Sequence, residues 1–163
     1  RETLSDGAGS ALRSVDYGYR GARLASRAVT DLTAGGGTRT TRYRWYGDDD
    51  AADPRAGLLA EVDGPRVDVA DVTRYEHDRQ TGNLLEITNA LGHVTRFTAH
   101  DMEGRPLVML DANGVETRFE YDVRGRLIAR SIAGASTSYR YDARGLLVEE
   151  RRPDGGGLDY TYD

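Results

Sequence analysis

Rings and polar side chains alternate in several short stretches of the chain. The clearest stretches are residues 119–122 (FEYD), 139–142 (YRYD) and 160–163 (YTYD). Successive side chains of a β-strand point to opposite faces, so this period of two predicts strands with their rings on one face and their charges on the other. The first two stretches each run into a turn that contains glycine and then into a second apolar stretch such as residues 126–131. This order of elements is typical of a β-hairpin.

The hairpin pattern recurs at a nearly constant interval. The turn glycines are spaced by 22, 21 and 20 residues at Gly82, Gly104, Gly125 and Gly145. The aspartate that precedes each turn recurs in step, at Asp78, Asp101, Asp122, Asp142 and Asp163. A second set of turns lies between them, at residues 90–92, 112–114, 133–134 and 153–155. Two strands and two turns per period leave no room for a helix, so the sequence predicts an all-β chain of tandem antiparallel hairpins.

The repeat positions predict three kinds of contact. Rings such as Tyr139 and Tyr141 are expected to stack between neighbouring hairpins into a ladder. The aspartate at the strand end is expected to accept hydrogen bonds from nearby backbone N–H groups of the turn. The arginine after the turn glycine, seen at Arg105 and Arg126, is expected to pair with that aspartate or to stack on a tyrosine. These roles are structural, and the full set of repeat positions is Gly82, Gly104, Tyr121, Asp122, Gly125, Arg126, Tyr139, Tyr141, Asp142, Gly145, Tyr162 and Asp163.

The first half of the chain carries looser copies of the pattern. Residues 16–24 and 43–47 resemble repeat openings, and residues 34–38 (AGGGT) and 63–65 (DGP) predict turns. Residues 48–57 predict a loose acidic loop. We therefore divide the chain into a poorly ordered lead-in at 1–14, degenerate hairpins at 15–74 and regular repeats of 20 to 23 residues at 75–163. The count is about six hairpins and the opening of a seventh.

Composition narrows the possible functions. The formal net charge is −5, which argues against a basic face that binds nucleic acid. All 22 basic residues are arginine and there is no cysteine, so lysine and thiolate chemistry, disulfides and cysteine-based zinc sites are excluded. No apolar run approaches the roughly 18 residues of a membrane-spanning helix. The sequence implies no cofactor.

Few residues are candidates for chemistry. His77 and His100 occupy the strand-end position of the repeat, where they replace an aromatic residue, and His93 stands apart. Asp48, Asp49, Asp50 and Asp53 lack the alternating spacing of a calcium loop, and residues 155–159 lack the period of a calcium β-roll. We therefore predict no catalytic residue and no metal site, and we assign no binding residue.

The pattern YDVRGRL at residues 121–127 closely resembles the Rhs/YD-repeat family, and so do residues 89–95 and 63–66. In that family the repeats form spiral β-sheets that close into a hollow shell, around a toxin in bacterial polymorphic toxins and insecticidal toxin complexes; teneurins carry related repeats. The family's self-cleavage core is Asp-Pro-x-Gly-Leu. Residues 53–58 (DPRAGL) have one residue more and lie between repeats, so we interpret them as a turn.

The resemblance implies a curved or spiralling antiparallel sheet that is an open segment of a β-shell. It implies a non-catalytic role in a secreted or cell-surface bacterial protein, where the partners are other repeats of the parent chain and an enclosed effector. A cell-surface carbohydrate-binding or adhesion module is the alternative, because exposed tyrosines and arginines can bind sugars. A closed barrel or a propeller is disfavoured by the period, which is about half of a propeller blade. A lone sheet leaves two edges unpaired, so the isolated segment is expected either to self-associate or to be resolved only as part of a larger assembly.

Overall fold

The computed structural model describes residues 1–33 and 36–163, and all the regular structure in this part of the chain is β-strand. The chain divides into two compact units, residues 1–94 and 95–163. Strands of the first unit are β1 (Glu2–Ser5), β2 (Ala11–Arg20), β3 (Arg23–Asp31), β4 (Thr38–Trp45), β5 (Leu59–Asp63), β6 (Val72–His77) and β7 (Leu84–Thr88). Those of the second unit are β8 (Val94–His100), β9 (Pro106–Leu110), β10 (Glu116–Tyr121), β11 (Leu127–Ile132), β12 (Ala135–Tyr141), β13 (Leu147–Arg151) and β14 (Gly157–Asp159).

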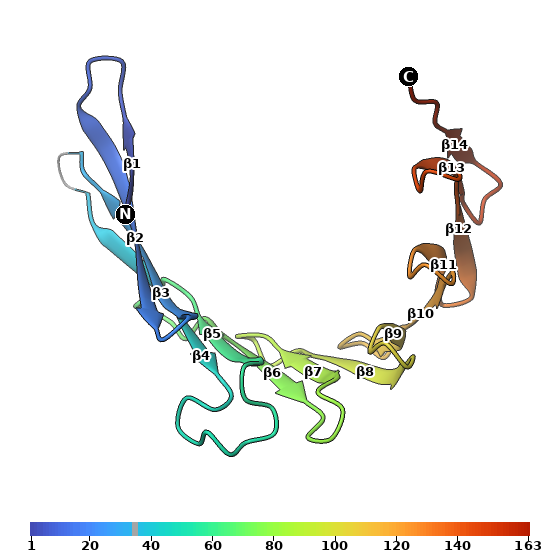
Figure 1. The fold of residues 1–163 in the computed structure, drawn as a ribbon, viewed down its shortest axis with the longest axis horizontal. Helices are drawn as coiled ribbons and strands as arrows, with labels where there is room; N and C mark the ends of the chain where they lie inside the picture. The colour runs from blue at the N-terminus through green and yellow to red at the C-terminus, as the bar shows by residue number, and fades with distance from the viewer. Residues whose placement is uncertain (34–35) are drawn as a thin grey trace. The chain divides into compact units, whose positions relative to one another are not determined.

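Strand order follows chain order from β1 to β14, as in an open antiparallel meander (Figure 1). The predicted all-β architecture of tandem antiparallel hairpins is therefore confirmed. The loop predicted at 48–57 lies between β4 and β5. Residues 1–14, predicted as a lead-in, contain β1 and the start of β2. In the turn predicted at 34–38, residues 34–35 lie outside the described part of the chain.

The connection after β5 is longer than the predicted turn at 63–65, because β6 begins only at Val72. Asp71 closes this connection. Its carbonyl oxygen accepts a hydrogen bond from the Gly64 N–H at 3.3 Å, and its carboxylate accepts one from the Arg66 N–H at 3.0 Å. The segment from 65 to 70 between these contacts is exposed, and Val67 is among its members.

Several hairpins carry a β-bulge next to the aromatic residue or histidine at the end of the first strand. In the β10–β11 pair, Glu120 lies opposite Ala129 and Tyr121 lies opposite Leu127, so Ile128 has no partner across the ladder. The same shift occurs before Tyr141 in the β12–β13 pair and before His77 in the β6–β7 pair. In the adjoining turn Gly125 has a φ of +79°, which glycine adopts without the steric cost that other residues bear. The repeated glycine is thus favoured by the backbone conformation of the turn.

The sheet has two faces of different chemistry, as the alternation in the sequence predicted. Along β10, Thr117, Phe119 and Tyr121 are covered while Arg118 and Glu120 are exposed. On the charged face, ion pairs cross neighbouring strands. Glu61 of β5 pairs with Arg44 of β4 at 3.4 Å and with Arg74 of β6 at 3.1 Å. Cross-strand pairs of opposite charge support the register, although each contributes little where it is solvent-exposed.

Neither unit has a hydrophobic core of the usual kind. Among the described residues, only Ser14, Ala60, Val15 and Thr117 are buried, at 1 to 6% relative exposure. The chain exposes 10820 Å², whereas a compact protein of its mass exposes about 8,000 Å². The apolar side chains of each unit are therefore only half-covered, and the hairpins must be held by contacts between neighbours.

Candidate functional site

One hydrogen bond recurs along the sheet and joins the tyrosine at the end of a strand to the backbone of the preceding hairpin. The Tyr121 hydroxyl donates a hydrogen bond to the Pro106 carbonyl oxygen at 3.1 Å. Tyr141 donates in the same way to Leu127 at 2.9 Å, and Tyr162 to Leu147 at 2.7 Å. The acceptors are the first residues of β9, β11 and β13. We call this the ring-to-carbonyl contact.

The first unit makes the same contact with other side chains. Trp45, the last residue of β4, donates its indole N–H to the Leu24 carbonyl of β3 at 2.7 Å. His77, the last residue of β6, places Nε2 3.1 Å from the Leu59 carbonyl at the start of β5. His77 therefore replaces a strand-end aromatic residue, as predicted. The sequence pattern did not reveal Trp45 in this role, because residues 43–47 (YRWYG) lack the aspartate that normally follows the ring.

Aspartate closes the turn of each regular repeat. One carboxylate oxygen of Asp122 accepts hydrogen bonds from the N–H groups of Arg124 and Arg126, at 2.9 and 3.0 Å. Asp101 accepts from Glu103 and Arg105 in the same pattern, and Asp142 accepts from the Leu146 N–H at 2.8 Å. These are the turn contacts expected from the sequence. Asp111 and Asn89 make them in the other row of turns as well.

Arginine after the turn glycine makes both contacts that were expected as alternatives. Arg126 Nε donates to Asp122 at 2.7 Å, and its guanidinium carbon lies 4.7 Å from the centre of the Tyr141 ring. Arg105 pairs with Asp101 at 2.6 Å and lies 4.8 Å from the Tyr121 ring. Each guanidinium thus links the turn of one hairpin to the ring of the next. The third copy has Leu146 in place of arginine, and Asp142 pairs with Arg144 instead.

The predicted ladder of stacked tyrosines is wrong. Among the described residues, ring-to-ring contacts join Tyr46 with His77 and Phe97 with His100, and no tyrosine of the regular repeats packs on another. The hairpins are too far apart for direct stacking, because an entire strand separates Tyr121 from Tyr141 in the sheet. The arginine side chain fills that distance. Tyr139 lies opposite Glu150, across the β12–β13 ladder.

The contacts change the protonation of the groups that make them. The Arg126 side chain, together with the backbone N–H of Arg126, holds the pKa of Asp122 below its ordinary value. Burial raises the pKa of Tyr121, so its hydroxyl remains a hydrogen-bond donor. The Asp122 carboxyl group is therefore ionised and the Tyr121 hydroxyl neutral over the physiological range.

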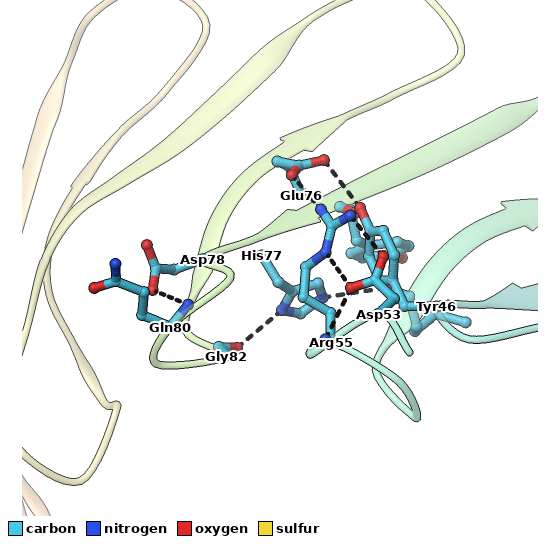
Figure 2. Close-up of polar contacts among 10 residues, drawn as sticks. Tyr46, Asp53, Arg55, Glu76, His77, Asp78, Gln80 and Gly82 are labelled. Atoms are coloured by element: carbon cyan, nitrogen blue, oxygen red, sulfur yellow. Dashed lines mark hydrogen bonds and ion pairs between the residues drawn. The ribbon is translucent and has the colours of Figure 1, made fainter. Parts of the chain in front are cut away.

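The long connection between β4 and β5 carries a separate cluster, shown in Figure 2. The Arg55 guanidinium lies 3.9 Å from the centre of the Tyr46 ring, pairs with Asp53 at 2.9 Å and reaches Glu76 at 2.6 Å. The Tyr46 hydroxyl lies 2.9 Å from both the Tyr75 carbonyl oxygen and Glu76. The side chains of Arg55 and Asp53 are each only 13% exposed. The loop expected to be loose is held to β6 by this cluster.

Asp53 stands at the position that resembles the family's self-cleavage core. Hydrogen bonds from the Arg55 side chain and backbone lower the pKa of Asp53 to about 2. An aspartate that is ionised and paired with arginine cannot act as a general acid near neutral pH. This geometry agrees with the interpretation of residues 53–58 as a turn.

The acidic stretch at residues 48–50, which precedes Asp53, also contributes to contacts within the chain. Asp48 accepts a hydrogen bond from the Trp45 N–H at 2.9 Å and faces Arg20 and Arg23. Within residues 1–33 and 36–163, no group of three histidine or acidic side chains converges as metal ligands would. That part of the chain also has no helix long and apolar enough to cross a membrane.

The other predicted positions lie where the repeat places them. Gly82, Gly104 and Gly145 have φ values of +77°, +78° and +92° in their turns, as Gly125 does in its own. Tyr162 is 46% exposed, and Asp163 is exposed beside it. The structure brings Asp122, Gly125, Arg126 and Tyr141 together as one joint between hairpins. The sequence analysis missed the acceptor of the ring hydroxyl, because a backbone carbonyl leaves no mark in the residue pattern.

The residues that form these joints lie in a part of the sequence that matches the model of a known family. The RHS repeat family matches residues 100–133 and 129–156. The matched residues, less than half of the chain, resemble RHS repeats. The matched residues contain the joints at Tyr121 and Tyr141. None of the curated proteins matches the sequence.

Among solved structures, the chain is similar to TcdB2-TccC3 without its hypervariable C-terminal region. The identity is 22% and the TM-score 0.50, over 99% of this chain and 11% of that chain. It is also similar to the Photorhabdus luminescens Tc holotoxin pore, with 16% identity and a TM-score of 0.32, over 92% of this chain and 11% of that one. The first similarity shows the fold alone. This chain spans about a tenth of the length of these solved chains.

The ring-to-carbonyl contact can be tested by removing one hydroxyl. Tyr141→Phe keeps the ring beside Arg126 but removes the hydrogen bond to Leu127. We expect it to lower the free energy of unfolding by about 0.5–1.5 kcal/mol, measured by chemical denaturation. Tyr19→Phe is the matched control, because Tyr19 is 64% exposed and should lose almost nothing. Equal losses in the two variants would contradict the contact.

The lowered pKa of Asp122 predicts a loss of stability in acid. A carboxylate whose pKa is lower in the folded chain stabilises the fold above its unfolded value, near pH 4, and this contribution disappears as the pH falls through the folded value. We expect Asp122→Asn to be less stable than the parent at pH 7 and to lose less stability between pH 5 and pH 3, measured by circular dichroism. Asp154→Asn is the control, because Asp154 accepts a hydrogen bond from the Gly156 N–H and pairs with no arginine of residues 1–33 and 36–163. An unchanged acid profile in Asp122→Asn would show that the pair with Arg126 does not stabilise the turn.

Proposed function

We propose that this segment is a non-catalytic wall element of an RHS-type shell that encloses or presents a C-terminal effector. The observation that carries the proposal is the repetition of one joint. The same ring-to-carbonyl contact recurs at Tyr121, Tyr141 and Tyr162, with acceptors at equivalent strand starts. A catalytic or binding site needs a unique constellation of residues, whereas a wall needs one joint used many times.

Burial supports the same role. A free-standing domain covers its apolar residues with a second layer, and these hairpins do not. The half-covered face and the unpaired outer strands require further repeats of the parent chain as partners. We place the protein among secreted or cell-surface bacterial proteins, since a shell for an effector serves delivery.

The alternative of a carbohydrate-binding module is less well supported. Sugar binding needs aromatic faces and hydroxyl groups that are free to contact the ligand. The hydroxyls of Tyr121 and Tyr141 donate to backbone carbonyls, and one side of each ring faces an arginine of the preceding turn. These hydroxyls and ring faces therefore already have partners within the sheet.

The isolated segment distinguishes the two functions. We expect its mass in light scattering to rise above 17.9 kDa as the concentration increases, because its edges and half-covered face are open. Titration with glycans, followed by tyrosine fluorescence, should give no saturable change. A segment that stays monomeric at high concentration and binds a glycan specifically would favour the adhesion module.

Containment is tested in the full parent chain. If the repeats form a wall, a protease-sensitive reporter fused after them should survive protease treatment for as long as the wall is intact. A matched fusion that lacks residues 100–156 should lose the reporter, because the wall is then interrupted. Equal digestion of the reporter in both fusions would overturn the shell proposal.

A further inference from the structure

His77 makes two contacts where the tyrosines of the regular repeats make one. Nε2 lies 3.1 Å from the Leu59 carbonyl oxygen of β5, and Nδ1 lies 3.2 Å from the Gly82 carbonyl oxygen in the turn after β6. Figure 2 shows the ring between Tyr46 and Gly82. One side chain thus joins two backbone segments that the sheet ladder leaves separate.

The two acceptors determine how many protons the imidazole must carry. A carbonyl oxygen only accepts hydrogen bonds, so both ring nitrogens must donate for both contacts to form. A neutral imidazole has a single N–H, and its other nitrogen would direct a lone pair at a carbonyl oxygen. The imidazolium cation has two N–H groups and satisfies both.

An aromatic ring and an ion-paired cluster lie near the imidazole. The Tyr46 ring meets the imidazole edge-on, with ring centres 5.9 Å apart. Behind it, Arg55 is neutralised by Asp53 and Glu76. The charged and titratable groups of the loop, of the neighbouring strands and of the following turn include Arg44, Tyr46, Asp53, Arg55, Glu61, Asp63, Arg74, Tyr75, Glu76, Asp78, Arg79 and Glu86. Both signs of charge are present, so it is the two carbonyl acceptors of the ring that favour the cation.

We propose that His77 is a proton-dependent latch, which ties the start of β5 to the turn at 78–82 when it is protonated and releases one of these ties when it is neutral. The second tie exists only in the imidazolium form, so the hairpin is held at both points when His77 is protonated and at one point when it is neutral.

Two groups near His77 keep the same protonation state between pH 5.5 and pH 8.0. Burial and a hydrogen bond to Glu76 raise the pKa of Tyr46, so the phenol stays neutral. Asp53 has a pKa of about 2 and stays ionised. A change in this region between pH 5.5 and pH 8.0 is therefore assigned to His77 by comparison with variants that lack the imidazole.

The test is hydrogen–deuterium exchange of the full chain, followed by mass spectrometry of peptides that cover β5 and β6 and corrected for the intrinsic exchange rate at each pH. We expect protection in these peptides to fall about tenfold from pH 5.5 to pH 8.0. His77→Tyr should abolish this pH dependence, because it restores the residue type of Tyr121 and Tyr141 with its single hydroxyl donor.

Two further variants complete the design. His77→Gln keeps one amide donor without a titration and serves if His77→Tyr does not fold. His93→Gln is the control, because the exposed His93 ring lies near the Asn89 side chain and contacts no strand start. The latch is overturned if the parent and the His77 variants share one pH dependence, or if His93→Gln removes it as well. Neither outcome depends on whether the repeats enclose an effector.

Discussion

The whole arrangement depends on a hydrogen bond from a strand-end side chain to the backbone of the preceding hairpin. Antiparallel pairing already fixes each strand against its neighbours, but it does not hold the exposed ends of the strands together. Tyr121, Tyr141 and Tyr162 do so at the row of turns that contains Asp122 and Asp142. Such a bond contributes roughly 1 kcal/mol, which is small for one joint and considerable when it is repeated in a sheet without a core.

Ion pairs and cation–π contacts provide part of the stabilisation that apolar packing provides in proteins with a hydrophobic core. In the regular repeats, one guanidinium is shared between an aspartate of its own turn and a ring of the next hairpin. The β4–β5 connection builds the same trio from different positions, with Arg55 between Asp53 and Tyr46. Arginine suits this task because its planar group can pair at its edge and stack on its face at once. The total absence of lysine agrees with that use.

The sequence predicted the architecture well because its signals are local. Alternation gave the strands, the periodic glycines gave the turns, and Asp122 and Arg126 met as their spacing suggested. It failed for the tyrosine rings, whose hydroxyl acceptors are backbone carbonyls of the preceding hairpin. The ring ladder was a reasonable inference from β10 and β12, yet it ignored the strand that lies between them. The contacts of Arg55 were also unpredictable, since they join residues 46, 55 and 76 without any periodic pattern.

The thirteen-residue connection between β4 and β5 replaces a turn of five residues in the regular hairpins. Closing the longer loop costs only roughly 1 kcal/mol more by chain entropy. Because every joint involves nearest neighbours alone, such an insertion disturbs no distant part of the array. Evolution can therefore lengthen single hairpins, and decorate the surface with new loops, while the neighbouring repeats keep their sequences.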